Sequence, residues 1–329
     1  MKQLRNYLAL VLISIFLVPL ISVGNAADNK LVIYTGSGPE ITDPLFAKFK
    51  EEYPGIDIEL VKAGSGELLS RIRAEKGNPG GDVLFGGEPL LFEVNKELFE
   101  PYACREDSNM VRQDKNNLWH IYSFMPQAIL VNTRILKSER DWPKTLKELA
   151  DPKWRQKGKI ALADPNKSGT GATIFCGMAS LYGWPYVENV LKNAEVLPGS
   201  DAMFDAVKDG SNPLGFINED LGLKWEKMNL PVKMIFPQDG ITNTFDASAI
   251  IAGAKNRTNA QRFIDFMASK DAHLILKNPI LRRSTRKDVT PAAGMIDLRK
   301  FKLIANKPLS RDEISKNFNE LLEKVRAGK

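Results

Sequence analysis

Short apolar runs alternate with longer amphipathic stretches along the first hundred residues of this 329-residue chain. Leu31–Tyr34, Ile56–Val61 and Asp82–Phe85 are short and rich in β-branched and aromatic residues, which predicts three strands. Between them, Ile41–Phe49 and Leu68–Ile72 carry apolar residues at helical spacing. Strands that alternate with helices in this way predict a parallel sheet in an α/β lobe.

The same alternation continues through the rest of the chain. The strands are predicted at 128–133, 159–162, 214–217 and 232–236, and the helices at 172–182, 202–208, 263–267 and 311–326. Trp142–Leu149 has the residue pattern of a capped helix start. Because a chain of this length lacks any low-complexity linker, we expect two α/β lobes that crossing strands join.

The first thirty residues differ from this pattern. Lys2 and Arg5 precede an apolar run from Leu8 to Val23, and the small residues Gly24–Ala26 follow it. This order is typical of a secretory signal peptide, here 1–26, that is removed after export. A membrane anchor is the alternative, but the apolar run is shorter than the roughly 20 residues that a spanning helix needs. We expect a soluble periplasmic protein, because no cysteine at the cleavage point could accept a lipid.

Charge and the rarer residue types exclude several classes of function. Removing the two leader cations lowers the formal net charge from +6 to +4, and no basic stripe with interleaved aromatics is present, so nucleic acid is not an expected partner. Cys104 and Cys176 could pair in an oxidising compartment, although a buried free thiol fits the pattern around Cys176 equally well. His120 and His273 belong to no cluster with metal-ligand spacing. We expect no metal, no cofactor and, without a hydrolase motif, no enzymatic activity.

Glycine and serine residues follow the first three predicted strands. They are Ser37 and Gly38, Ser65 and Gly66, and Gly87. Open α/β sheets bind ligands at the carboxyl ends of their strands, and such loops also begin helices, whose free amides attract anions. A single loop of this kind is compatible with an ordinary turn that needs glycine. Three of them at one sheet edge favour a binding site.

A similar corner begins a predicted helix in the second half of the chain. Ser168, Gly169 and Thr170 combine small hydroxyl side chains with glycine, and Ser200 stands at the next strand-to-helix corner. Main-chain donors and hydroxyls in this arrangement form an anion-binding site. Serine and threonine are also common N-caps, so the motif alone is not specific.

Five segments together resemble the type II periplasmic binding proteins, in the branch that binds ferric ion or phosphate esters. They are Val32–Ser37, Gly81–Val83, Val131–Thr133, Asp164–Thr170 and Ala252–Ser269. The resemblance covers nearly all of the mature chain. It implies two α/β lobes, each a mixed sheet flanked by helices, with the ligand bound between them.

The resemblance also implies how the chain is divided. The implied parts are an N-terminal lobe of 27–130 with 246–300, a C-terminal lobe of 131–245, a helical tail of 301–329, and hinge strands at 128–133 and 244–250. A protein of this family is expected to be a monomer that delivers its ligand to an inner-membrane ABC permease.

The expected ligand depends on the residues after the strand 214–217. Iron-binding members of the family place two adjacent tyrosines there, whereas this chain has Asn218, Glu219 and Asp220 and no adjacent tyrosine pair anywhere. We therefore expect Glu219 and Asp220 to face the cleft as acceptors for sugar hydroxyls or an amino group, opposite an anion at Ser168–Thr170. A solvated strand end or a salt bridge between the lobes is the alternative for the two carboxylates.

The preferred ligand is thus a small phosphorylated organic anion, such as a sugar phosphate or a phosphonate. The alternative is a ferric ion or ferric chelate that carboxylates hold in place of tyrosines. A thiamine-like or polyamine-like cation could stack on Trp119, Trp184 or Trp225, but the anion-binding motif argues against it.

Overall fold

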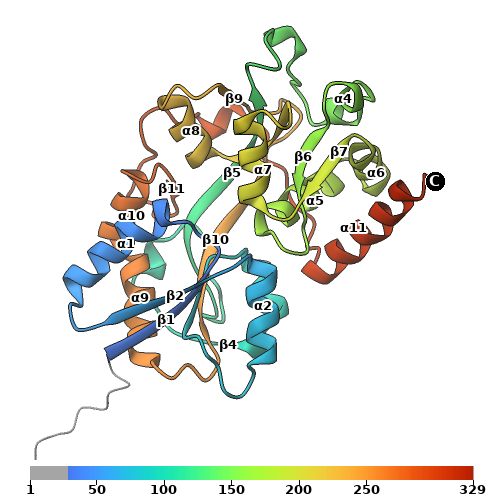
Figure 1. Ribbon diagram of the computed structural model, residues 1–329. Helices are drawn as coiled ribbons and strands as arrows, with labels where there is room; N and C mark the ends of the chain where they lie inside the picture. Colours follow the sequence, from blue (N-terminus) through green and yellow to red (C-terminus); the bar gives the residue numbers. More distant parts are fainter. Residues whose placement is uncertain (1–28, 329) are drawn as a thin grey trace, which may run out of the picture.

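The computed structural model describes residues 29–328 and shows two α/β lobes with strands running between them (Figure 1). This architecture confirms the predicted fold class. The predicted signal peptide lies outside the described residues. Within 29–328, no helix combines the length and apolar character that crossing a bilayer requires.

The first lobe is built on three parallel strands. The central strand β1 (Lys30–Thr35) lies between β2 (Asp57–Lys62) and β3 (Val83–Phe85). Two helices, α1 (Pro39–Glu52) and α2 (Ser65–Ala74), provide the crossovers that parallel strands need. All residues of β1 after the first are buried, as expected for a strand covered on both faces. The loops that end these strands therefore meet at one edge of the sheet.

Two long antiparallel strands connect the lobes. Residues His120–Asn132 form β5, and residues Thr242–Ile251 form β10; they pair from Thr242 opposite Gln127 to Ser248 opposite His120, with a register shift after Asp246. Strand β10 also pairs with β3 of the first lobe, and β5 pairs with β8 of the second, so within residues 29–328 one sheet of 11 strands extends through both lobes. Only the second half of β5 was predicted.

The second lobe repeats the arrangement of strand and helix. Its strands are β6 (Ile160–Ala163), β7 (Ala194–Leu197), β8 (Leu214–Asn218) and β9 (Val232–Ile235). Its helices are α4 (Lys153–Gln156), α5 (Gly169–Tyr182), α6 (Trp184–Lys192), α7 (Ser200–Asp209), α8 (Glu219–Lys227) and the C-terminal α11 (Arg311–Arg326). The other helices and strands are α3 (Pro89–Val94), β4 (Phe99–Glu100), α9 (Arg257–Ala268), α10 (Lys270–Lys277) and β11 (Arg283–Ser284).

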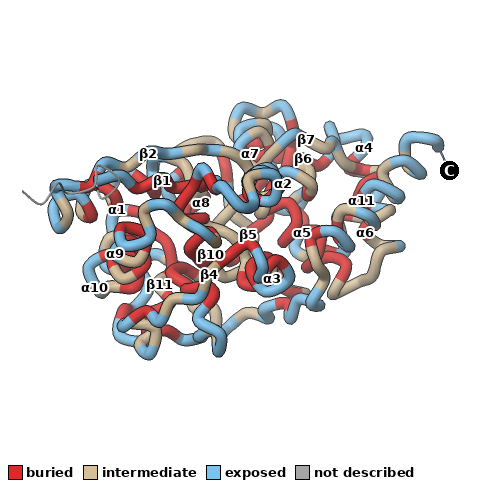
Figure 2. The backbone as a smooth tube through the Cα atoms, turned by 90° about the horizontal axis from the view of Figure 1, so that it is seen from below, coloured by how far each residue is buried: buried red, intermediate tan, exposed pale blue. Residues whose placement is uncertain are grey.

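Each lobe has its own hydrophobic core. In the first core, Phe263 of α9 contacts Phe46, Phe49 and Phe85, with ring centroids 5.5–5.7 Å apart. Along β5, residues up to Tyr122 belong to the first core and residues from Ala128 belong to the second. In Figure 2 the crossing strands are buried, whereas the outer turns of the helices are exposed. The lobe boundaries given above stay a prediction.

Three local features differ from the sequence-based expectations. The segment around Trp142–Leu149 forms two short 3₁₀ turns, Glu139–Asp141 and Lys147–Ala150, in place of an α-helix. Helix α8 was not predicted, and it starts directly at Glu219. Cys104 and Cys176 are buried free thiols in different cores, so they do not form the disulfide that the sequence left open.

The C-terminal helix α11 is fixed to the second lobe by Phe318. Its ring is 1% exposed and lies 5.0 Å from that of Phe175, centroid to centroid. We expect Phe318→Ala to lower the free energy of unfolding by about 3–5 kcal/mol, because it removes a buried ring and leaves a cavity. Urea denaturation checks this. The control Leu274→Ala, at a side chain 45% exposed, should stay within about 0.5 kcal/mol of the wild type. A similar small loss for both variants would contradict the docking of α11.

Candidate functional site

A cavity of about 150 Å³ lies between the lobes, at the carboxyl ends of the parallel strands. The first lobe contributes the loops after β1, β2 and β3, and the second lobe contributes the starts of α5, α7 and α8. The predicted site residues that line it are Ser37, Gly38, Ser65, Gly87, Ser168, Gly169, Thr170, Ser200 and Asp220. Gly66 and Glu219 do not line it.

Five helices, α1, α2, α5, α7 and α8, begin at this cavity. The N-caps of α1, α2 and α7 are Gly38, Gly64 and Gly199, and that of α8 is Asn218. None of these four described N-caps accepts a hydrogen bond through its side chain. First-turn amides have no acceptor within their own helix, so they remain available to a bound ligand. The cavity is therefore surrounded by main-chain donors and by the positive ends of helix dipoles.

Helix α5 has the least compensated of these positive ends. The first turns of α1, α2, α7 and α8 each contain an acidic residue, whereas the described first turn of α5 contains none. Ser168 caps α5 by accepting from the Gly171 amide at 3.0 Å, and its hydroxyl lies 3.1 Å from the hydroxyl of Ser200. Because Gly169 and Thr170 occupy the first two helical positions, their amides are free. An anion is best stabilised here.

Arg311 places a buried cation behind this helix start. It is 7% exposed and donates to the Pro165 and Ser168 carbonyls of the second lobe at 3.1 Å. It also donates to the Ser65 hydroxyl at 2.9 Å and to Glu88 at 2.7 Å, both in the first lobe. A single guanidinium, carried by the C-terminal helix, thus connects the two lobes at the anion-binding end of the cavity.

The opposite end of the cavity is organised around Arg282. Its Nε and Nη2 donate to Asp220 at 2.9 and 2.8 Å, and its Nη1 donates to Asp246 at 2.9 Å. Burial lowers the pKa of the guanidinium, but the two carboxylates outweigh this and hold the pKa above its ordinary value. The Oδ1 atoms of Asp220 and Asn218 are buried and accept no hydrogen bond within residues 29–328. A bound ligand or a water molecule can supply the donors that these two acceptors lack.

Glu219 does not face the cleft, contrary to expectation. Its carboxylate is 3% exposed and forms two hydrogen bonds with Arg283 of β11, at 2.6 and 2.7 Å. Glu219 and Asp220 are consecutive residues of α8, and consecutive side chains of an α-helix point about 100° apart. Only one of them can therefore face the cavity. Of the interpretations considered above, a salt bridge describes both residues, and Asp220 in addition lines the cavity.

Gly66 contributes to contact between the lobes and not to the cavity wall. A Cβ atom at Gly66 would lie 2.2 Å from the Asn166 carbonyl oxygen, and one at Gly64 would lie 2.1 Å from that of Lys167. Real Cβ atoms do not approach main-chain oxygens so closely. Glycine at these positions lets the start of α2 meet the second lobe directly.

Sequence reasoning missed the charged residues that complete the site. Arg282, Asp246 and Lys224 line the cavity, and Arg311 lies behind its wall. They stand far along the chain from the glycine-rich loops, on elements that the crossing strands bring back to the cleft. The sequence offered one signal for them, which is that Arg282 and Arg283 are adjacent.

Comparisons with known proteins show the family to which this chain belongs. Residues 79–293 match the family described as bacterial extracellular solute-binding protein. A protein of Haemophilus influenzae is 30% identical over 268 residues, which is 74% of each chain. Iron uptake protein A1 of Synechocystis is 27% identical over 275 residues, which cover 76% of this chain and 74% of that one.

A solved structure has the same fold. It is the periplasmic binding protein AfuA of Actinobacillus pleuropneumoniae with exogenous fructose-6-phosphate bound, which matches with a TM-score of 0.82 and 25% identity over 90% of this chain and 98% of that one. Since the family match spans more than half of the chain, the protein belongs to the bacterial extracellular solute-binding proteins, the periplasmic ligand-binding components of ABC importers.

Proposed function

We propose that this solute-binding protein captures a small phosphorylated organic solute between its lobes and delivers it to an inner-membrane permease. The observation that carries the proposal is the start of α5, which opens on the cavity without an acidic residue in its first turn. The phosphoryl group would accept from the Gly169 and Thr170 amides. Hydroxyl groups of Ser65 and Ser200, from opposite lobes, would complete its hydrogen bonds.

Hydrogen bonds of this kind are sufficient for a useful affinity. A hydrogen bond to a charged group contributes about 1.5–3 kcal/mol. Four or five of them reach the roughly −8 kcal/mol of a micromolar complex after the cost of association is subtracted. A cationic side chain in direct contact with the phosphoryl group is not needed.

The other end of the cavity supports a solute that also carries donors. The charged side chains lining the cavity are Glu40, Glu88, Asp201, Asp220, Asp246, Lys224 and Arg282. Glu88 is paired with Arg311, and Asp220 and Asp246 are paired with Arg282, but the unpaired Oδ1 atoms of Asn218 and Asp220 remain. A hydroxyl or ammonium group of the solute would satisfy them, which a bare inorganic phosphate cannot do as well.

The size of the cavity distinguishes among such solutes. A cavity of about 150 Å³ has the volume that benzene fills in a protein core. In this arrangement of the lobes we therefore expect a compact phosphorylated or phosphonylated solute to fit better than a hexose phosphate, which would require the lobes to lie further apart.

A ferric ligand has less support from the site. Hard cations require anionic oxygen ligands, but Arg282 already occupies the position between Asp220 and Asp246. Among residues 29–328, no tyrosine lines the cavity. Because the chain is similar to an iron uptake protein, binding of ferric ion is the result that would overturn the proposal.

Capture and release would proceed by hinge motion about β5 and β10, as a monomer in the periplasm and without chemistry on the solute. Contacts that bridge the lobes in this arrangement include Arg311 and the pair of Lys62 with Asp201, whose charged atoms lie 3.7 Å apart. A solute that touches both lobes favours the closed state, because only that state offers all of its contacts.

Thermal unfolding of the signal-free protein, refolded to remove bound solute, tests the ligand class. At about 100 times its Kd, the solute should raise the midpoint by roughly 5 °C, since binding adds about 2.7 kcal/mol. We expect shifts with aminoethylphosphonate or three-carbon phosphates, smaller ones with hexose phosphates, and none with free sugars. A shift with ferric citrate alone would overturn the proposal.

The double variant Ser168→Ala with Thr170→Ala tests the anion-binding end. It should weaken every phosphorylated solute about 10- to 100-fold, because it removes the Thr170 hydroxyl from the cavity wall and the Ser168 hydroxyl that positions the hydroxyl of Ser200. Titration calorimetry measures this. Ser269→Ala is a matched control, because Ser269 caps α10 in the same way, away from the cavity. Unchanged affinity in the double variant would show that the anion binds elsewhere.

The two neighbouring carboxylates should behave differently when neutralised. Asp220→Asn should lower the preference for ammonium-bearing solutes about tenfold, because it removes the negative charge of the carboxylate whose Oδ1 has no donor. Glu219→Gln should leave the order of preference unchanged and lower stability by about 3 kcal/mol, since it leaves the buried Arg283 without its partner. Competition binding and urea denaturation measure the two effects. Altered preference in Glu219→Gln alone would reverse the assignment.

A further inference from the structure

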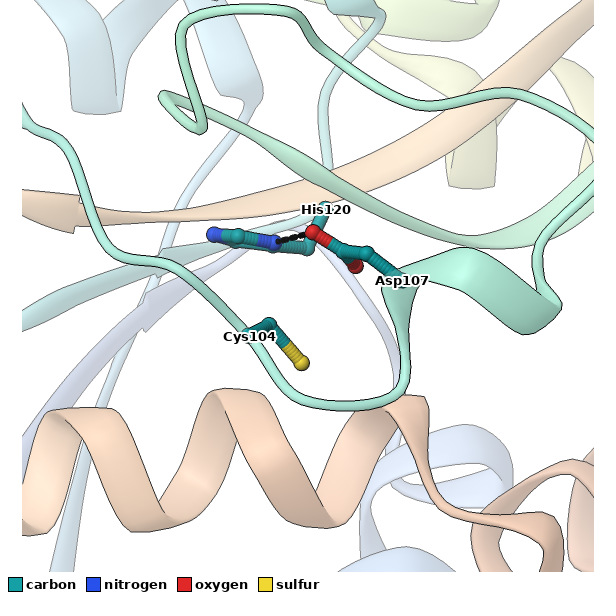
Figure 3. A group of neighbouring side chains, drawn as sticks. All are labelled: Cys104, Asp107 and His120. Carbon is teal, nitrogen blue, oxygen red and sulfur yellow. Dashed lines mark hydrogen bonds and ion pairs between the residues drawn. The ribbon is translucent and has the colours of Figure 1, made fainter.

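Three potential metal ligands meet in the first lobe, outside the cleft. They are Cys104, Asp107 and His120, and Figure 3 shows the Asp107 carboxylate meeting the His120 ring with Cys104 beside them. Cys104 and Asp107 belong to the segment between β4 and β5, and His120 is the first residue of β5. His120 therefore belongs to a cluster of potential metal ligands, contrary to expectation, because the loop folds back and brings it to residues more than ten positions earlier. None of the three lines the cleft cavity.

The ligand atoms of this cluster are close and largely shielded from water. All of them lie within 4.8 Å of one another. His120 Nδ1 lies 2.7 Å from Asp107 Oδ2, and the two side chains are 4% and 13% exposed. Cys104 is 8% exposed. One face of the cluster is covered by the ring of Tyr102, whose centroid is 6.1 Å from that of His120.

The surroundings of the cluster are electronegative. Burial raises the pKa of the Cys104 thiol, and the carboxylates of Asp107 and Asp265 raise it further. Asp265 accepts the Tyr102 hydroxyl at 2.7 Å through Oδ2, while its Oδ1 is buried and accepts no hydrogen bond within residues 29–328. The carboxylates of Asp107 and Asp265 thus lie close to the Cys104 thiol, and this arrangement of buried acceptors favours a bound cation.

The neighbouring cation does not compensate the cluster. Arg286 donates to Glu106, to Asp288 and to the Ala268 carbonyl, so its donors are directed at other partners. Apart from the Nδ1 contact of His120, the cluster therefore offers sulfur, nitrogen and oxygen ligands that are not engaged by positive charge.

We propose that Cys104, Asp107 and His120 form a binding site for a divalent transition-metal ion of the zinc type. Thiolate, imidazole and carboxylate are the ligands that Zn²⁺ uses, whereas Mg²⁺ and Ca²⁺ select oxygen ligands alone. Zinc bonds of about 2.0–2.3 Å place tetrahedral ligands roughly 3.3–3.8 Å apart. Binding therefore opens the His120–Asp107 hydrogen bond and draws Cys104 inward. Asp265 or a water molecule takes the fourth position.

Metal binding to this site releases one proton. The metal forms a bond to Cys104 sulfur, the S–H bond breaks, and the proton leaves to solvent. The imidazole binds as the neutral ring through a nitrogen that carries no proton. The site fixes the segment before β5 to the end of a strand that joins the lobes, and its role is therefore structural.

Titration of the folded, signal-free protein with Co²⁺ and Zn²⁺ tests the site without any cleft ligand. With Co²⁺ we expect a thiolate-to-metal charge-transfer band that saturates at one ion per chain and disappears on addition of Zn²⁺. Zn²⁺ should raise the unfolding midpoint by several degrees and release about one proton. Cys104→Ser should lose the band and at least tenfold in Zn²⁺ affinity. Cys176→Ser, at the other buried thiol, should retain both.

Two further measurements test the metal site even if Cys104→Ser fails to fold. Asp107→Asn keeps an acceptor for His120 and should bind Zn²⁺ at least tenfold more weakly. In the wild type, Zn²⁺ should slow alkylation of Cys104, identified by peptide mass, and leave that of Cys176 unchanged. The proposal is overturned if no charge-transfer band forms, if the band persists in Cys104→Ser, or if alkylation of the two thiols responds equally. Solute binding in the cleft is measured separately, so failure of either proposal leaves the other open.

Discussion

The antiparallel pairing of β5 with β10 is the constraint on which the rest of the structure depends. These strands carry the hydrogen bonds that continue the sheet from β3 in one lobe to β8 in the other. Because the sheet is continuous, the carboxyl ends of both sets of parallel strands face the same gap. The starts of α1, α2, α5, α7 and α8 are then placed around a single cavity. The binding site is thus a product of topology, and the crossing strands are the part that can bend without dismantling either core.

Charge in the cleft is arranged in two layers. Cations that neutralise the acidic side chains, Arg282 and Arg311, are buried and hold their carboxylates in place. The cavity surface offers a solute amides and hydroxyls at the α5 end. At the α8 end it offers the paired Arg282, Lys224, and the oxygens of Asn218 and Asp220 that lack a donor within residues 29–328. A solute that is anionic at one end and a hydrogen-bond donor at the other matches both. Such a surface selects a solute by the positions of its anionic group and its hydrogen-bond donors more than by its net charge.

Much of the fold could be predicted from the sequence because it rests on local patterns. The apolar runs that became β1, β6 and β8 are continuous and short, β2 alternates polar and apolar residues, and α11 occupies the range its periodicity indicates. The Ser168–Thr170 corner was found because glycine and hydroxyl residues at a helix start have a local meaning. Arg282 and the orientation of Glu219 could not be predicted, because they depend on which distant strand returns to the cleft and on the phase of α8. The grouping of Cys104 with His120 depends likewise on how an irregular segment folds back.

The glycines at positions 64 and 66 determine how far the lobes can close. Main-chain oxygens of Asn166 and Lys167 fill the space where side chains at these positions would begin. A single methyl group at either position would act as a spacer between the lobes, well away from the solute itself. Such a variant would still bind its solute to one lobe, but it would not reach the fully closed conformation that distinguishes the ligand-bound from the ligand-free protein. The absence of side chains at Gly64 and Gly66 therefore permits the close approach of the lobes by which a permease could distinguish the ligand-bound protein from the free one.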